Sequence, residues 1–367
     1  MSKGMRIAFF ASSLVSAYWN GAATYYRGIV RALHARGHRV TFYEPDAFGR
    51  QQHRDMADPA WAEVVVYPAG SEAGVLRTVE AARGADLVVK ASGVGVHDEL
   101  LERAVLGLQG PSTTVVYWDV DAPATLDRMQ ADPADALRLL VPRYDLVLTY
   151  GGGEPVRQAY RALGARDCIP IYNALDPSTH FPVEADPRFE GDLAFLGNRL
   201  PDREARVEAF FLHAAAALPQ RRFLLGGSGW QDKPLPPNVR HVGHVYTAAH
   251  NAFNCTPLAV LNVSRESMAR YGFSPATRVF EAAGAAACLV TDAWPGLEQF
   301  FEPGSEVLVA RDGDEVAQQL QGLDPQRARA IGRAAYRRVL ADHTYDHRAA
   351  QFDAVLEGRS RAREVAA

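Results

Sequence analysis

One stretch in the second half of the chain carries the residues whose types and spacing best suit chemistry. It reads RYGFSPATRVFEAAGAAACLVTD and runs from Arg270 to Asp292. Helical spacing puts Ser274, Thr277, Arg278 and Glu281 on one polar stripe and leaves small apolar residues on the opposite face. A carboxylate in such an apolar helix is costly to bury unless something pairs with it. The pattern therefore predicts a partner for Glu281.

The start of this helix suggests what the partner is. Ser274 precedes Pro275, a pair typical of the N-cap and first turn of a helix. The free amides of a helix N-terminus, together with Arg278, suit a diphosphate. Glu281, one turn further on, could then accept hydrogen bonds from the hydroxyls of a nucleotide ribose. The alternative is that Arg278 and Glu281 only pair with each other along the helix.

A second group of carboxylates lies in YWDVDAP, where Asp119 and Asp121 end an apolar run. Side chains at the end of a buried strand can project into a ligand site. We expect Asp121, and secondarily Asp119, to position an acceptor or to act as a general base. A turn carboxylate that caps the helix beginning near Pro123 is an equally good interpretation. The DxD spacing is too short a pattern to predict a metal site.

Three glycine clusters and a histidine pair are further candidates for cofactor or metal sites. SGVGV, YGGGEP and LGGSGW each follow an apolar run, but none is a GxGxxG that opens a helix, which argues against a nicotinamide enzyme. Gly151 and Gly152 either let a ligand approach backbone amides or make a tight turn. His343 and His347 have helical spacing but no convincing third ligand, so a solvated helix face is favoured and no metal is expected.

Short apolar runs that alternate with helical patterns must position these residues. In the first half the runs are RIAFFAS, RVTFYEP, EVVVYP, DLVVKAS, TTVVYWD and DLVLTYG, and a helix is predicted from Ala23 to Arg36. After a proline-rich stretch between about Tyr172 and Gly191, the runs DLAFLGN, RFLLGGS, VRHVGH, LAVLNVS, ACLVTD and EVLVARD follow. Continuous apolar runs separated by helices are typical of parallel sheets covered on both faces.

The predicted fold class is therefore α/β, with two Rossmann-like, doubly wound domains that face each other across a cleft. We expect an N-terminal, acceptor-side domain over residues 1–175 and a C-terminal, donor-side domain over residues 176–345. Residues 346–367 are expected to form a C-terminal helix that packs back on the first domain.

Composition narrows the class of protein. The chain has 367 residues, of which 48% are apolar and 22% charged, with a net charge of -4. This is an ordinary globular balance, and the lack of a basic excess argues against a nucleic-acid partner. The three cysteines form no CxxC pair, so reduced thiols are expected. No apolar run is long enough for a transmembrane segment, and a cytoplasmic location is expected.

The segment from Val239 to His343 resembles the second domain of the glycosyltransferase group 1 family, which has the GT-B fold. The matching motifs are NVRHVGHV, LAVLNVS, the Gly272-Phe273 pair, FEAAGAAACLVTD and GSEVLVARDGDEVAQQL. Within that family the chain looks most similar to the branch of the spore maturation protein CgeB, through GFSP, FEA and GLEQFF. The N-terminal NGAATYYRGIVRALHARGHRVTFYEP also resembles the first loop, helix and second strand of GT-B enzymes, so the resemblance covers nearly the whole chain.

The resemblance implies roles for individual residues. Glu281 matches the glutamate that binds the donor ribose, Arg199 the basic residue that contacts the diphosphate, and Gly21 the glycine loop of the other domain. The remaining residues implied for the donor are Arg278, Thr277, Ser274, Phe273, Asn198, Gly197 and His244. Those implied for the acceptor or the cleft are Asn20, Tyr150, Gly151 and Gly152. Phe273 stands where the family usually has an earlier glutamate that touches the transferred sugar.

The expected activity is transfer of a sugar from a nucleoside diphosphate sugar, with a UDP-sugar favoured, to an unidentified acceptor. No cofactor and no metal are expected. By resemblance the reaction is expected to retain configuration, with the leaving phosphate taking the acceptor proton; an inverting reaction would need Asp121 or Asp119 as the base. The alternatives are a nucleotide-sugar epimerase or hydrolase on the same fold, and a nucleotide-sugar-binding protein without activity.

Overall fold

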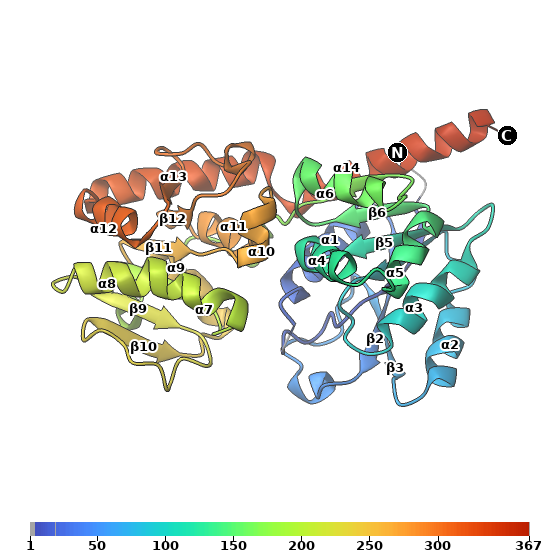
Figure 1. Ribbon diagram of the computed structural model, residues 1–367, viewed down its shortest axis with the longest axis horizontal. Helices are drawn as coiled ribbons and strands as arrows, with labels where there is room; N and C mark the ends of the chain where they lie inside the picture. Colours follow the sequence, from blue (N-terminus) through green and yellow to red (C-terminus); the bar gives the residue numbers. More distant parts are fainter. Residues whose placement is uncertain (1–3, 19, 367) are drawn as a thin grey trace. The chain divides into compact units, whose positions relative to one another are not determined.

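The computed structural model describes residues 4–18 and 20–366 of the chain. Its residues form two compact units, one made of Met1–Tyr172 with Tyr345–Ala367 and the other of Asn173–Thr344 (Figure 1). The chain passes from the first unit to the second at the start of the proline-rich stretch. It returns to the first at Tyr345, so the last helix belongs to the N-terminal unit.

The N-terminal unit is built on a seven-stranded parallel sheet with the order β3-β2-β1-β4-β5-β6-β7. Its strands are β1 (Arg6–Phe10), β2 (Arg39–Asp46), β3 (Glu63–Pro68), β4 (Leu87–Ala91), β5 (Thr114–Asp119), β6 (Leu146–Thr149) and β7 (Cys168–Pro170). The first six are the apolar runs that the sequence predicts. The strand order reverses between β1 and β4, and ligands of open α/β sheets bind at the carboxyl ends of strands beside such a point.

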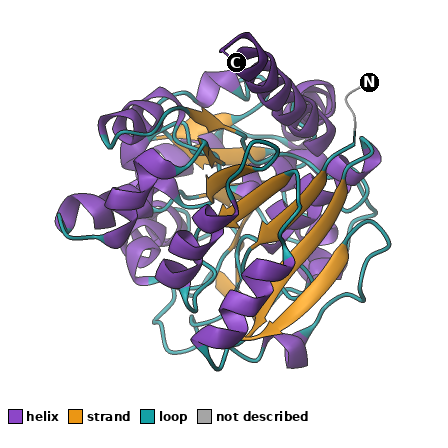
Figure 2. Cartoon of the chain, turned by 90° about the vertical axis from the view of Figure 1, so that its right-hand side faces the viewer, coloured by secondary structure: helices purple, strands orange, loops and turns teal. Residues whose placement is uncertain are grey.

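Helices accompany the N-terminal sheet, as Figure 2 shows. They are α1 (Ala23–Ala35), α2 (Glu72–Ala81), α3 (Asp98–Ala104), α4 (Ala122–Ala131), α5 (Ala136–Leu140), α6 (Gly153–Ala162) and α14 (Tyr345–Ala366). Helix α14 packs closely against α1: a Cβ atom at Gly28 would lie 2.1 Å from the ring of Tyr345. The ring of Phe352 stacks on Trp118 with 5.6 Å between the ring centres. The last helix is therefore part of the N-terminal core.

The C-terminal unit has a six-stranded parallel sheet with the order β10-β9-β8-β11-β12-β13. Its strands are β8 (Leu193–Leu196), β9 (Phe223–Gly226), β10 (Val239–Gly243), β11 (Ala259–Asn262), β12 (Leu289–Asp292) and β13 (Leu308–Ala310). All six are apolar runs predicted from the sequence. Here the order reverses between β8 and β11, so the loops that follow these two strands are the expected place for a ligand.

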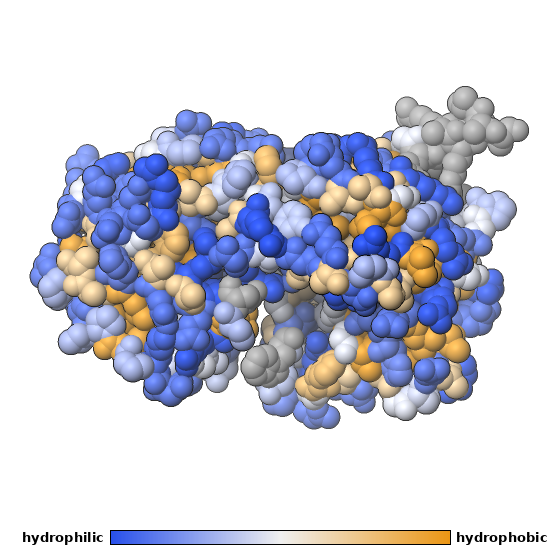
Figure 3. All heavy atoms as spheres, viewed as in Figure 1, coloured by the Kyte–Doolittle hydropathy of each residue, from blue (hydrophilic) through white to orange (hydrophobic). Residues whose placement is uncertain are grey.

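The helices of the C-terminal unit cover a continuous apolar core. They are α7 (Pro201–Val207), α8 (His213–Ala217), α9 (His250–Cys255), α10 (Glu266–Tyr271), α11 (Thr277–Gly284), α12 (Gly313–Gln321) and α13 (Pro325–Asp342). Residues such as Phe195, Phe211, Leu261 and Val290 are buried between helices and strands. Figure 3 shows hydrophilic residues spread over much of the visible face. Among the described residues, no helix is both long and apolar enough to cross a membrane.

Candidate functional site

Helix α11 presents Glu281 from a largely buried element. Val279, Phe280 and Ala282 of the same helix are buried, and the chain continues from α11 into β12. The side chain of Glu281 is only 13% exposed. The apolar face expected from the sequence therefore anchors α11 in the unit, while a small part of the Glu281 side chain stays exposed.

The carboxylate of Glu281 accepts no hydrogen bond from any residue that the structure describes. Nε2 of His180 lies 3.7 Å from one of its carboxylate oxygens. Burial raises the pKa of Glu281, but His180, His250 and Arg278 together outweigh burial and leave the pKa below its usual value. Glu281 is thus held ionised, and an ionised buried carboxylate without hydrogen bonds is costly unless a ligand supplies the donors.

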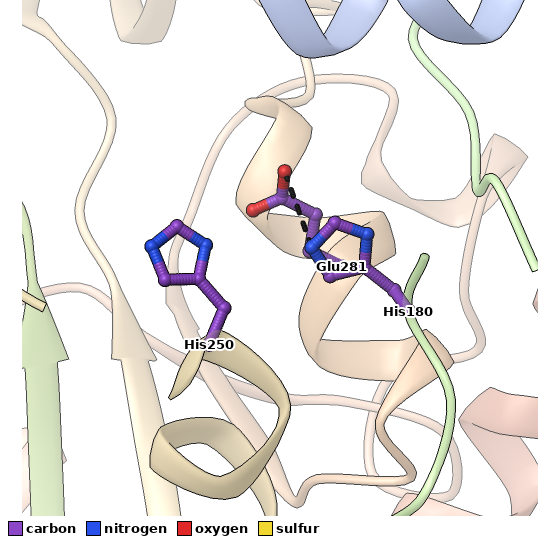
Figure 4. A group of neighbouring side chains, drawn as sticks. All are labelled: His180, His250 and Glu281. Carbon is purple, nitrogen blue, oxygen red and sulfur yellow. Dashed lines mark ion pairs between the residues drawn. The ribbon is translucent and has the colours of Figure 1, made fainter. Parts of the chain in front are cut away.

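Two histidines border this carboxylate, and the sequence did not suggest either (Figure 4). The ring nitrogen Nε2 of His250 lies 3.1 Å from the carbonyl oxygen of Val245. A carbonyl only accepts hydrogen bonds, so Nε2 carries the proton and Nδ1 faces Glu281. Nδ1 of His180 bonds to the hydroxyl of Thr179 at 3.0 Å, which leaves Nε2 toward Glu281. Burial lowers the pKa of His250, and the nearby charge of Glu281 acts in the opposite direction.

The start of α11 differs from the sequence prediction. The helix begins at Thr277 with Ala276 as its N-cap, instead of at Ser274. The reason is local: the hydroxyl of Ser274 donates to the carbonyl oxygen of Gly272 at 2.9 Å, so Ser274 does not cap the helix. Asn173 stabilises the start of α11 at Thr277, because its side-chain amide donates to the carbonyl oxygen of Pro275 and its side-chain oxygen accepts from the hydroxyl of Thr277.

Arg278 is a cation whose charge is only partly compensated. Its guanidinium forms no hydrogen bond or ion pair with any side chain in the described part of the protein. Burial lowers the pKa of Arg278 to about 10; the nearby charge of Glu281 acts to raise it, and that of Arg203 acts to lower it. The alternative in which Arg278 and Glu281 form a direct pair is therefore not realised. A partly buried arginine beside a helix N-terminus suits an anion.

The turn after β8 contains Gly197, Asn198 and Arg199 at the reversal of strand order. The guanidinium of Arg199 bonds to Glu204 at 2.7 Å and to Asp232 at 2.9 Å, so two carboxylates already compensate its charge. The oxygen of Asn198 accepts from the amide of Ser228 at 3.0 Å and shapes the turn.

Arg203, four residues after Arg199, is a basic residue that sequence reasoning missed. A Cβ atom at Gly197 would lie 3.0 Å from its Nη1 atom, so glycine lets this guanidinium approach the end of β8. Its position in the first turn of α7 was the only signal in the sequence.

Phe273 and His244 complete the expected donor residues. Phe273 has a φ of 48°, which is unusual for a bulky residue. Its amide donates to the carbonyl oxygen of Pro295 at 2.7 Å, and a Cβ atom at Gly296 would lie 2.1 Å from its ring. The Phe273 turn is therefore fixed by packing. His244 is exposed and meets the ring of Tyr246 edge to face, with 4.6 Å between the ring centres.

In the N-terminal unit, Asp119 has the environment of a structural carboxylate. It is fully buried and accepts hydrogen bonds from Ser92 at 2.8 Å, from Thr125 at 3.0 Å and from the amide of Asp121 at 3.0 Å. The hydroxyl of Tyr160 also donates to it. Burial raises the pKa of Asp119. With its oxygens engaged and inaccessible to an acceptor, Asp119 does not suit the expected role of general base.

Asp121 and the loop after β1 lie at other strand ends of the same unit. Asp121 is half-buried directly before α4, and its side chain does not cap that helix. Asn20 donates to the carbonyls of Ser13 and Ser16 and accepts from Ser12, so its side chain organises the loop. Gly21, next to it, is exposed, with open space where a Cβ atom would lie.

The glycines after β6 form the start of α6. Gly152 has a φ of 93°, and a Cβ atom there would lie 1.9 Å from Val156. The carbonyl oxygen of Gly151 accepts from the hydroxyl of Thr149. The ring of Tyr150 lies 5.3 Å from that of Tyr25, measured between their centres. These contacts account for the glycines as a tight strand-to-helix turn.

The two histidines with helical spacing have unlike environments. His343 is buried in the C-terminal unit beside the rings of Phe280, Phe300 and Phe301. His347 is an exposed residue of α14 in the N-terminal unit. Within residues 4–18 and 20–366, the group that could hold a metal is instead His180, His250 and Glu281. Sequence spacing gave no sign of it, because its members come from three separate segments.

Comparison with known proteins identifies the fold. The glycosyl transferase-like family matches residues 203–354. Anabaena Alr3699/HepE in complex with UDP and glucose is similar at 16% identity over 96% of this chain and 100% of that chain, with a TM-score of 0.67. Sucrose-phosphate synthase from Thermosynechococcus elongatus is similar at 16% identity over 98% and 100%, with a TM-score of 0.70. No curated protein matches the chain.

A further structural neighbour is an alpha-glucosyltransferase in complex with UDP and a 13-mer DNA, at 15% identity over 96% of this chain and 99% of that chain, with a TM-score of 0.68. The chain therefore has the GT-B fold of two-domain glycosyltransferases, as the sequence predicts. The matched family segment contains α11 and Glu281.

Proposed function

We propose that this protein is a glycosyltransferase that moves a sugar from a UDP-sugar to an acceptor, with the donor bound by the C-terminal unit. The observation that carries the proposal is Glu281, an ionised, nearly buried carboxylate to which no described residue donates a hydrogen bond. The 2′- and 3′-hydroxyls of a ribose are two donors that would satisfy it. The GT-B fold and the UDP complexes of two structural neighbours support this interpretation.

The diphosphate is assigned to the start of α11. The amides at this end and the partly compensated Arg278 lie one turn before Glu281, which suits a ligand with a diphosphate next to a ribose. Arg203 lies close enough to affect the pKa of Arg278, so the two add positive charge to one region. Arg199 has a smaller role in this proposal, because Glu204 and Asp232 already bind it.

The reaction breaks the bond between the anomeric carbon of the sugar and the diphosphate oxygen, and forms a bond to an acceptor oxygen. Negative charge builds on the departing diphosphate, where Arg278 and the α11 amides stabilise it. In the proposed retaining, metal-independent reaction, a phosphate oxygen takes the acceptor proton. Asp121 is the carboxylate proposed to position the acceptor, since it is half-buried whereas Asp119 is fully enclosed.

A thermal-shift screen with UDP-, GDP-, dTDP-, ADP- and CMP-linked sugars tests the proposal. A ligand that binds only the native state raises the melting temperature by mass action, and we expect UDP-sugars to give the largest rise. UDP release is then measured with and without candidate acceptors. Release that depends on an acceptor supports a transferase. Equal UDP release without an acceptor would indicate a hydrolase, and conversion of one UDP-sugar into another without UDP release would indicate an epimerase. A screen without any shift would refute nucleotide-sugar binding.

A further inference from the structure

Three side chains from separate segments converge on one point of the C-terminal unit. His180 lies in the proline-rich stretch between Tyr172 and Gly191, His250 begins α9 and Glu281 lies on α11. Each offers one nitrogen or oxygen atom, and these atoms all lie within 4.8 Å of one another. Nε2 of His180 is 3.7 Å from the carboxylate oxygen of Glu281. Figure 4 shows the imidazole of His250 and the carboxylate turned toward each other.

The backbone packing brings the segments that carry His180, His250 and Glu281 close together. A Cβ atom at Gly284 would lie 3.1 Å from the carbonyl oxygen of His180, so glycine lets the His180 segment pack on α11. The amide of Asn251 donates to the carbonyl of Thr179 at 3.0 Å, which joins the same segment to α9. Three elements are thereby fixed relative to one another within a single unit.

Each histidine also has an outer partner that sets the direction of its ring. The Val245 carbonyl accepts from Nε2 of His250, and the Thr179 hydroxyl bonds to Nδ1 of His180. Ligand histidines of metal sites nearly always have such a partner on the second nitrogen, which fixes ring orientation and tautomer. The atoms left facing inward are a lone pair of His250, the free nitrogen of His180 and a carboxylate. A cation satisfies all three.

We propose that His180, His250 and Glu281 form a binding site for a divalent transition-metal ion of the Zn²⁺ type. Two imidazoles and one carboxylate, with a fourth position open, are a ligand set that zinc uses in proteins. The imidazoles favour zinc over Mg²⁺, which prefers oxygen ligands. Bonds of about 2.1 Å in a tetrahedral site place ligand atoms about 3.4 Å apart. The His180–Glu281 distance of 3.7 Å is already close to this value, and the candidate ligand atom of His250 lies within 4.8 Å of the other two.

The ion would use the carboxylate that the proposed function gives to the ribose. Metal and nucleotide then compete for Glu281, so the ion acts as an inhibitor of donor binding. This consequence rests on the proposed function, whereas the metal site itself does not. It also differs from the expectation from sequence, in which no metal takes part.

The site is tested by titrating Zn²⁺ into EDTA-treated, dialysed full-length protein in a calorimeter. We expect one ion per chain, with affinity lowered at least tenfold in His250→Ala and about tenfold in Thr179→Val. The second variant keeps all three ligands and removes the hydroxyl that bonds to His180 and to the carbonyl oxygen of Asp176. His213→Ala is the matched control, because His213 is an exposed histidine of the same unit paired with Asp314. Replacing Zn²⁺ by Co²⁺ adds a visible spectrum that reports tetrahedral coordination.

Unchanged melting temperatures in EDTA show that the variants fold. Absence of stoichiometric binding would overturn the site, as would equal affinity in wild type and His250→Ala. Competition is measured with uridine, which has the ribose but no diphosphate to chelate the ion. We expect saturating Zn²⁺ to weaken uridine binding about tenfold. Zinc binding that leaves uridine affinity unchanged would refute the competition, and a protein that binds zinc but no nucleoside or nucleotide would refute the proposed function alone.

Discussion

The two units treat a buried carboxylate in opposite ways. In the N-terminal unit, Asp119 ends β5 without any exposed surface and accepts hydrogen bonds from three hydroxyls and one amide. In the C-terminal unit, Glu281 on α11 keeps a small exposed area and accepts none within the described residues. The sequence predicts a functional role for both positions. What distinguishes them is whether the protein itself supplies the donors, and a carboxylate left without them is the better candidate for a ligand site.

Asp119→Ala is expected to cause the largest change, a loss of unfolding free energy. Its removal leaves the hydroxyls of Ser92, Thr125 and Tyr160 buried without their acceptor. We expect the free energy of unfolding to fall by about 4 kcal/mol, measured by urea denaturation. At a temperature where the variant remains folded, its affinity for UDP should equal that of wild type. A stable variant with weak UDP binding would instead make Asp119 a ligand residue.

A second buried carboxylate of the N-terminal unit predicts a pH dependence of stability. Burial raises the pKa of Glu102 to about 7, above its ordinary value. A carboxyl with a raised pKa stabilises the folded protein at low pH, and this contribution is lost as pH rises through about 7. Glu102→Gln should remove a decrease of up to about 3 kcal/mol in unfolding free energy between pH 4.5 and pH 8.

Unfolding free energies at several pH values check the Glu102 prediction. Glu99→Gln, an exposed position on the same helix, is the control and should keep the pH dependence of wild type. Identical pH profiles for wild type and Glu102→Gln would contradict the prediction.

For Glu281→Gln the effect should appear in binding. Hydrogen bonds to a charged group are worth about 2 kcal/mol, so we expect UDP to bind about 30-fold more weakly, with no loss of unfolding free energy. Calorimetry measures the affinity. Glu298→Gln changes an exposed glutamate of the same unit and should bind UDP as wild type does. Equal affinities in Glu281→Gln and Glu298→Gln would remove the basis of the proposed site.

The smallest expected effect is the difference in UDP affinity between variants of Arg278 and Arg199. Arg278 has no paired carboxylate among the described residues, whereas Glu204 and Asp232 bind Arg199. We expect Arg278→Ala to weaken UDP binding about tenfold and Arg199→Ala less than about threefold, since a compensated charge attracts a diphosphate less. Titrations of UDP and of uridine separate the effect on the diphosphate. The reverse order of the two arginines would place the diphosphate at the turn after β8.

The sequence predicted the fold well because buried parallel strands appear as continuous apolar runs. All twelve predicted runs are strands, and of the strands in the described part of the chain only β7, with three residues before the proline-rich stretch, was missed. The site was less accessible to sequence reasoning. Because the Ser274 hydroxyl bonds to the Gly272 carbonyl, it does not cap α11, and the helix begins later than predicted, at Thr277. The hydroxyls of Ser92 and Tyr160 that donate to Asp119 come from segments distant in the sequence. His180 and His250 meet Glu281 only through the packing of the fold.

The central claim is that Glu281 receives ribose hydroxyls, and a comparison of UDP with 2′,3′-dideoxy-UDP tests it most directly. Calorimetric titration of both ligands into wild type and Glu281→Gln gives a double cycle. We expect wild type to bind the dideoxy ligand about 30-fold more weakly than UDP, and Glu281→Gln to discriminate little between them. The same loss of affinity in both proteins would show that the hydroxyls do not reach Glu281, and would contradict the account.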